Sequence, residues 1–170
     1  AGRINPSGKL AETFPRVYED TPTGHNGQFG RDDMVCYEEE IMVGYRHYEK
    51  NDILPMFCFG HGLSYTEFAY HDLQVKQDND AKDRVSISFD IENVGQIDGR
   101  EIVQIYVRDE ECTVIRPEKE LKAFKSITLK AGSVCRVEIT LDSMAFSFYD
   151  EKKHDFCVEP GIFEICVGNS

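Results

Sequence analysis

Apolar and polar residues alternate with a period of two along most of the second half of the chain. Between residues 85 and 92, Val, Ile, Phe and Ile occupy every second position, and Ser, Ser, Asp and Glu lie between them. This pattern is typical of an antiparallel strand with one buried face and one wet face. The same reasoning predicts strands at residues 69–76, 102–108, 121–129, 137–141, 145–149, 156–159 and 163–167. About seven short strands at this spacing indicate an all-β sandwich of the fibronectin type III or immunoglobulin type.

The N-terminal part, residues 1–34, shows no long periodic run. Pro6, Pro15 and Pro22, together with several glycines, interrupt any helix or long strand. Its scattered apolar side chains still need cover, so we expect this irregular arm to lie along another surface. The cluster of Thr, Pro, Gly and Asn at residues 21–30 predicts a mobile loop.

Residues 36–48 form one further element. Ile41, Val43 and Tyr45 alternate with Met, Gly and Arg, and this alternation predicts a strand. Three consecutive glutamates at residues 38–40 leave a helix as the alternative.

Residues 57–68, which we call the joint, separate the irregular arm from the strand series. Four aromatic side chains surround Gly60 and Gly62 in this stretch. Glycine tolerates positive φ and close backbone approach, so the joint is expected to be a tight loop that exposes His61. Two readings stay open: a buried plug between two parts of the protein, or a loop that also contacts a ligand.

Charge and composition narrow the classes of partner. The formal net charge is −12 and the sequence pI is near 4.8. A field of that sign repels phosphate backbones, which argues against a nucleic acid partner. No run approaches the roughly 20 apolar residues that a membrane helix needs, so no membrane partner is expected.

Cysteine spacing and targeting signals bear on metals and location. None of the six cysteines has CxxC spacing, and the histidines are not placed to complete a zinc site. We therefore expect no metal and no cofactor. The first residues lack the pattern of a signal peptide, and Asn5-Pro6-Ser7 is not a glycosylation sequon because of its proline. These features favour a cytoplasmic location over secretion.

The joint also carries a family resemblance. Residues 57–65 read FCFGHGLSY and closely resemble the FPFGxGLSY stretch of family 3 glycoside hydrolases, the β-glucosidase and β-xylosidase group. Five further segments resemble that family in the same order: residues 6–15, 43–48, 93–107, 116–124 and 160–168. The departures, such as Ala11 and Cys58 in place of the family's usual Pro, lie in loops and turns.

The resemblance implies a parent enzyme with three layers. A TIM-like barrel carries an Asp nucleophile, an α/β sandwich carries a Glu acid/base, and a fibronectin III-like domain follows. In this chain, residues 1–66 would be the tail of the α/β sandwich domain with its linker, and residues 67–170 the fibronectin type III-like domain. Neither catalytic carboxylate can be carried over onto a residue of this chain.

The resemblance further implies partners and a rim site. The partners would be the rest of the parent hydrolase and, through it, a β-linked sugar substrate. The joint would lie near the mouth of the active site, with Phe57, Phe59 and His61 as candidates for its rim. Two alternatives from other classes are a carbohydrate-binding module and an immunoglobulin-like interaction module. The absence of Trp and the inward direction of most aromatic side chains count against the first.

Overall fold

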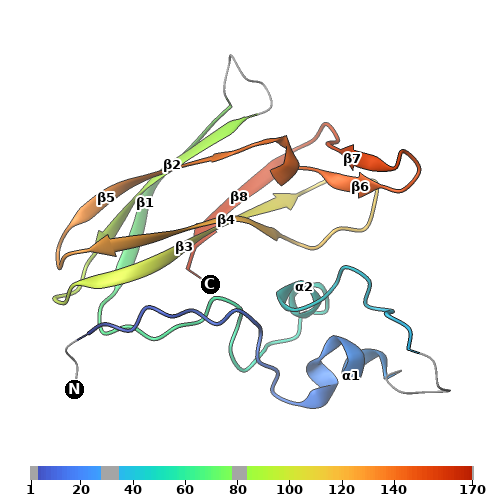
Figure 1. Ribbon diagram of the computed structural model, residues 1–170, viewed down its shortest axis with the longest axis horizontal. Helices are drawn as coiled ribbons and strands as arrows, with labels where there is room; N and C mark the ends of the chain where they lie inside the picture. Colours follow the sequence, from blue (N-terminus) through green and yellow to red (C-terminus); the bar gives the residue numbers. More distant parts are fainter. Residues whose placement is uncertain (1–3, 28–34, 78–83, 170) are drawn as a thin grey trace.

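The computed structural model describes residues 4–27, 35–77 and 84–169 (Figure 1). Within these residues the strands form two three-stranded antiparallel sheets and a two-stranded hairpin. One sheet has the order β1 (Phe68–Gln77), β2 (Val85–Asn93), β5 (Val134–Leu141). The other has the order β4 (Glu120–Leu129), β3 (Gly99–Asp109), β8 (Phe163–Gly168), and β6 (Phe148–Asp150) pairs with β7 (Asp155–Cys157).

The core lies between the two sheets. In β2, Ile87, Phe89 and Ile91 are almost completely buried, and in β3 Val103 and Ile105 are equally inaccessible. Each such side chain contributes about 1.5–3 kcal/mol by leaving water. The predicted alternation and the all-β sandwich of fibronectin type are therefore confirmed.

A buried asparagine fixes the start of the sandwich. Asn93, at the end of β2, accepts a hydrogen bond of 2.5 Å from the hydroxyl of Thr66 and donates one of 2.8 Å to the carbonyl of Ile97. Its side-chain oxygen also accepts from the backbone N–H of Gly95. Thr66 of the joint is thus hydrogen-bonded, through Asn93, to the turn between β2 and β3.

One predicted strand, at residues 145–149, is only partly correct. Residues Ser143–Ala145 form a short 3-10 helix, η2, and extended structure starts at Phe148. Asp142 causes the difference, because its side chain accepts from the backbone N–H of Met144 at 3.1 Å and so caps a helical turn.

The arm and the joint form a second layer against the β4-β3-β8 sheet (Figure 1). The two segments run antiparallel, with Leu10 N–H bonded to the carbonyl of His61 and Phe14 N–H bonded to that of Phe57, each at 2.8 Å. The expectation that the arm lies along another surface is confirmed. The arm continues into η1 (Tyr18–Asp20) and α1 (Pro22–Asn26).

The predicted strand at residues 36–48 is wrong. Residues 38–41 form a turn, and α2 (Tyr45–Lys50) follows as a helix. Gly44 breaks the extended run, since its φ of 56° and ψ of −139° turn the chain into the helix. Apolar alternation before Gly44 was therefore a misleading signal.

The predicted loop at residues 21–30 also needs correction. Residues 22–26 are helical because Thr21 accepts from Gly24 N–H at 3.1 Å, Pro22 occupies the first helical position, and Gly27 ends the helix at a φ of 64°. Residues 28–30 of the predicted loop lie outside the described residues.

Helix α2 is attached to the edge strand β4. The hydroxyl of Tyr45 accepts from the backbone N–H of Leu121 at 2.9 Å. Glu49 pairs at 2.7 Å with Lys119, the residue before β4, and Tyr45 also packs against Phe59, so α2 lies between the sandwich and the joint. These contacts position the elements around the candidate site.

Candidate functional site

The joint makes a tight turn over strand β3. His61 N–H donates to the carbonyl of Cys58 at 3.1 Å, and Gly60, the third residue of this turn, has a φ of +83°. Positive φ at that position is the signature of a type II turn, which favours glycine. A Cβ at Gly60 would lie 2.5 Å from the side-chain nitrogen of Gln104, so the backbone rests directly on β3.

The arm holds the same turn from the other side. Gly60 N–H donates to the carbonyl of Leu10 at 2.8 Å, next to the bond between Leu10 N–H and His61. An ion pair adds to this attachment, because Lys9 reaches Glu101 of β3 at 2.9 Å and both side chains are largely buried. The turn is therefore fixed by backbone and side-chain contacts.

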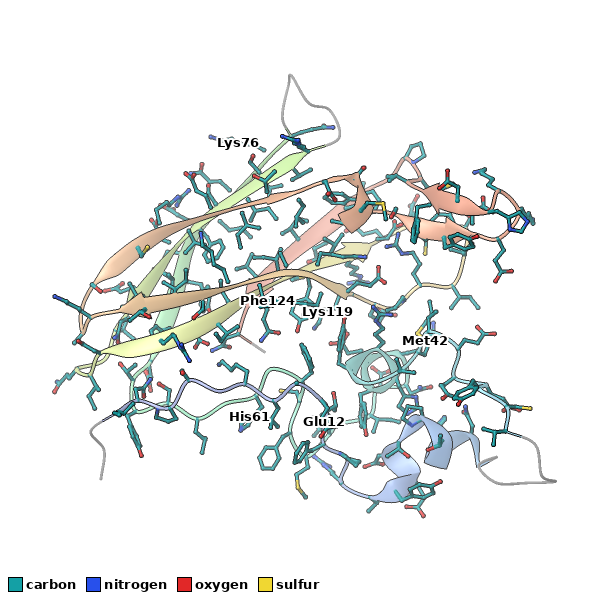
Figure 2. The ribbon with its side chains drawn as sticks, viewed as in Figure 1. Glu12, Met42, His61, Lys76, Lys119 and Phe124 are labelled. Carbon is teal, nitrogen blue, oxygen red and sulfur yellow. The ribbon has the colours of Figure 1, made fainter. Side chains whose placement is uncertain are left out.

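Two of the three rim candidates lie together on the outside of the joint. The rings of Phe57 and His61 are 4.9 Å apart at a tilt of 36°, and Phe14 meets Phe57 edge-on at 6.2 Å. Phe57 is 41% exposed and Phe14 is 38% exposed. Figure 2 shows His61 in the layer of the arm and joint. We call Phe14, Phe57 and His61 the aromatic patch.

The third candidate, Phe59, points elsewhere. Its ring is half-buried and packs at 5.3 Å against Tyr45 of α2, which in turn stands edge-on to Tyr106 of β3 at 5.8 Å. Phe59 therefore connects the joint to the helix and the sheet. The structure brings Phe57 and His61 together and separates Phe59 from them.

The support beneath the joint was missed by sequence reasoning. Tyr106 donates to the side-chain oxygen of Gln104 at 2.6 Å, and Gln104 donates to the carbonyl of Asn169 at 2.9 Å. Burial raises the pKa of Tyr106 above its ordinary value of 10, so its hydroxyl keeps its proton even at alkaline pH. Gln104 and Tyr106 lie on the outer face of the strand predicted at residues 102–108. Because neither side chain is charged, the sequence could have indicated that another segment covers this face.

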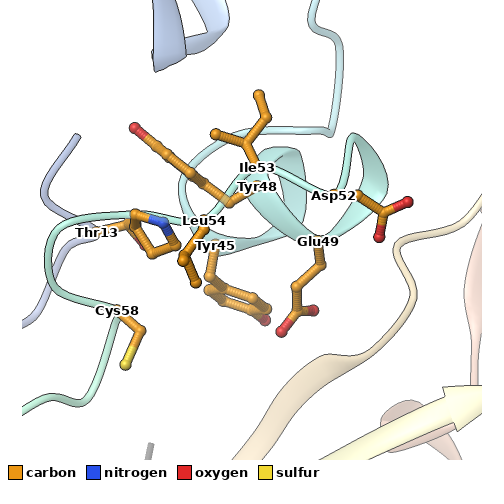
Figure 3. Close-up of a pocket in the computed structure, with 9 residues that line it drawn as sticks. Thr13, Tyr45, Tyr48, Glu49, Asp52, Ile53, Leu54 and Cys58 are labelled. Atoms are coloured by element: carbon orange, nitrogen blue, oxygen red, sulfur yellow. The ribbon is translucent and has the colours of Figure 1, made fainter. Parts of the chain in front are cut away.

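A pocket of about 310 Å³ opens beside the joint, between α2 and the arm. Figure 3 shows Tyr45 and Glu49 extending from α2 toward the same side. The lining is a mixture of aromatic, aliphatic and polar residues: Thr13, Tyr45, Tyr48, Glu49, Asp52, Ile53, Leu54, Pro55 and Cys58. Of the two acidic residues in this lining, Glu49 and Asp52, Glu49 pairs with Lys119 through Oε1 at 2.7 Å.

A charged cluster lies near the N-terminal end of α2, where Arg46 reaches Glu120 at 3.6 Å. Arg116 donates to Asp109 at 3.0 Å and to Glu120 at 2.7 Å, and Lys122 reaches Glu120 at 3.0 Å. Burial alone would raise the pKa of Glu120, but hydrogen bonds from Arg116 and Lys122 outweigh it and lower the pKa. A carboxylate held ionised in this way is a structural ion-pair partner and a poor proton donor.

Among residues 4–27, 35–77 and 84–169, His, Cys, Asp and Glu side chains form no group of three or more that could hold a metal ion. In the same ranges, every helix is too short or too polar to cross a membrane.

Residues 101–170, which run from β3 to the end of the chain, match the family model of the fibronectin type III-like domain. The fold and this match define a fibronectin type III-like β-sandwich module with an N-terminal segment packed on one sheet.

Known proteins extend the similarity to nearly the whole chain. Thermostable beta-glucosidase B of Acetivibrio thermocellus is 47% identical over 99% of the chain, which covers 22% of that protein. Beta-glucosidase BoGH3A of Bacteroides ovatus is 36% identical over the whole chain and 23% of its own length. The crystal structure of the GH3 beta-glucosidase of Bifidobacterium adolescentis superposes with a TM-score of 0.92 at 37% identity, over 99% of this chain and 25% of that one.

Over nearly its whole length, this chain is therefore similar to one part of family 3 glycoside hydrolases, as its motifs indicated. It spans about a fifth to a quarter of the length of the relatives that it matches.

Proposed function

We propose that this chain is a non-catalytic portion of a retaining β-glycosidase of the β-glucosidase type. The parent enzyme would hydrolyse O-glycosyl bonds at the non-reducing ends of β-glucosides or oligosaccharides. This portion would stabilise the enzyme and shape the rim of its active site. The observation that carries the proposal is the 47% identity with beta-glucosidase B, sustained over 99% of the chain.

The carboxylates of this chain support a non-catalytic role. Retaining glycosidases use two carboxyl groups about 5–5.5 Å apart, one as nucleophile and one as acid/base. The buried carboxylates here are paired with cations: Glu101 with Lys9, and Asp109 with Arg116. By resemblance, both catalytic carboxylates belong to parts of the parent outside this chain.

The aromatic patch supports a role at the rim. Phe57 and His61, whose rings lie 4.9 Å apart at a tilt of 36°, offer an apolar wall to the face of a sugar or of its aglycone. The wall would hold its place because the backbone on which it stands is bonded to the arm at Leu10 and Phe14. Such a wall acts mainly on binding and leaves the chemical step to other groups.

The remaining exposed apolar side chains of the arm and joint support contact with the rest of the hydrolase. Ile4, Leu63 and Tyr65 are 86%, 77% and 57% exposed. Exposed apolar residues gathered in one layer are typical of a surface that another part of a protein covers. We propose that the remainder of the parent enzyme covers this layer.

The rim role is tested in a full-length chimera, in which this chain replaces the matching part of beta-glucosidase B. For His61→Ala we expect KM for an aryl β-glucoside to rise by roughly tenfold or less, about 1.4 kcal/mol, with kcat almost unchanged. His71→Ala is the matched control, because His71 is an exposed histidine on β1. Loss of thermal stability with an unchanged KM would show that His61 only fills the junction.

A carbohydrate-binding module finds less support. Exposed rings do occur on the hairpin, where Tyr149 and Phe156 are 50% and 53% exposed. Their planes meet at 74°, however, so the two rings do not form a flat platform for a sugar chain.

A further inference from the structure

A buried histidine joins the two helical pieces of the N-terminal layer. His47 of α2 is 3% exposed. One of its ring nitrogens, Nε2, lies 3.1 Å from the backbone carbonyl oxygen of Asp20 in η1. The other, Nδ1, lies 3.2 Å from the side-chain nitrogen of Asn51, one turn further along α2.

These two contacts select one state of the imidazole. The carbonyl of Asp20 can only accept, so Nε2 carries a proton and donates it. The amide nitrogen of Asn51 can only donate, so Nδ1 has no proton and accepts. Both contacts are satisfied by the neutral ring alone, and a second proton on Nδ1 would face an N–H group.

Rotation of the Asn51 amide does not relieve this conflict. The same amide nitrogen donates to the backbone carbonyl of His47 at 3.0 Å. Exchanging nitrogen and oxygen would place two oxygens against each other at that distance. A charged His47 keeps its donation to Asp20 but loses the contact with Asn51, and its positive charge stays buried beside the ring of His25.

The charged and titratable groups around His47 come from three elements. From α1, the ring of His25 stands edge-on at 5.4 Å. Burial lowers the pKa of His47 below its ordinary value of 6.5, and a positive charge on His25 lowers this pKa further. The hydrogen bond to Asp20 and the charge of Glu39, in the preceding turn, act in the opposite direction. The carboxylate of Asp20 is bonded to N–H groups within its own segment, and the neighbouring Tyr48 of α2 is buried.

We propose that His47 is a pH-sensitive contact that holds the η1–α1 segment, residues 18–26, against helix α2 when its ring is neutral and releases that segment when the ring is protonated. The pKa of the docked state is lowered, so the docking free energy is complete above the pKa of the released state, near 6.5, and falls as the pH drops below it. Each unit of lowering makes release up to about tenfold easier at low pH.

The position of α2 gives this contact a consequence. The helix also carries Tyr45, which packs against Phe59 of the joint. Release of the η1–α1 segment would uncover the buried side of α2 and loosen the element behind the joint, while the sandwich stays intact. This inference goes beyond the proposed function and does not depend on it.

Hydrogen exchange of the full 170-residue chain at pH 7.5 and pH 5.0 tests the proposal. After correction for intrinsic exchange, we expect protection of residues 18–26 to fall by about tenfold or more at pH 5.0, with β2 unchanged. His47→Gln offers a donor and an acceptor without titrating, so its protection should be equal at both pH values. His71→Gln, at an exposed histidine, should behave like the unaltered chain.

Two results would overturn the proposal: no fall in the unaltered chain, or the same fall in His47→Gln. If His47→Gln does not fold, nitrogen chemical shifts of the His47 ring in the unaltered chain decide the matter. The ring must titrate below its ordinary pKa of 6.5, and the fall in protection must lie between pH 6.5 and that midpoint. A midpoint at or above 6.5 would refute the pH-sensitive contact.

Discussion

Gly60 lies where the joint turns over strand β3, with a φ of +83° and no room for a side chain. The nearest atoms are the side chain of Gln104 and the backbone oxygen of Asn169, at 2.5 and 3.1 Å from an added Cβ. Conformation and space both require glycine here. The aromatic patch therefore depends on a residue that has no side chain of its own.

We predict that Gly60→Ala lowers the free energy of unfolding by about 1–3 kcal/mol. The positive φ is unfavourable for alanine, and the added Cβ would collide with the side chain of Gln104. Gly132→Ala is the matched control, because Gly132 also has a positive φ of 68° but meets nothing within 4 Å. Urea unfolding of both variants gives the comparison. Equal losses would mean that the contact with Gln104 adds nothing.

At the scale of elements, the alternation of side chains predicted the sandwich well. Strand β2 is long and its buried positions repeat every second residue, and β3 keeps the same alternation of apolar residues although the joint also covers Gln104 and Tyr106. The short helices were not predicted because caps and single glycines set them. Thr21 begins α1 and Gly44 begins α2, and neither changes the apolar period of its neighbours.

The candidate site was predictable only in part, for a related reason. The glycines of the joint predicted a tight turn, and the structure has this turn at Gly60. The direction of Phe59 could not be foreseen, because it depends on Tyr45, and Tyr45 lies on the helix that was taken for a strand. Because residues 36–48 were predicted as a strand, the contact between Phe59 and helix α2 could not be predicted either.

The two layers should differ in local stability. We predict the slowest amide exchange in β2 and β3, which carry the core, and exchange about a hundredfold faster over most of the arm. Within the arm, Leu10 and Phe14 should be the slowest, since their N–H groups are bonded to the joint. Uniform protection across residues 4–169 would contradict the expected boundary between residues 66 and 67.

At the scale of the whole molecule, the chain is a sandwich with a covered face. The β4-β3-β8 sheet packs its inner side on the core and its outer side on the arm and joint (Figure 1). Polar contacts, such as the ion pair of Lys9 with Glu101, hold the second layer in place. Exposed apolar side chains on that layer, such as Ile4 and Leu63, form the surface that we propose the rest of the parent enzyme covers.

We propose that this chain completes a family 3 β-glucosidase without performing its chemistry. The most direct measurement is turnover of an aryl β-glucoside by the purified chain and by its chimera with beta-glucosidase B. We predict no turnover by the chain above a blank from the same host, and turnover by the chimera within about tenfold of beta-glucosidase B itself, a difference of about 1.4 kcal/mol. Turnover by the chain alone, or a folded chimera without activity, would contradict the account.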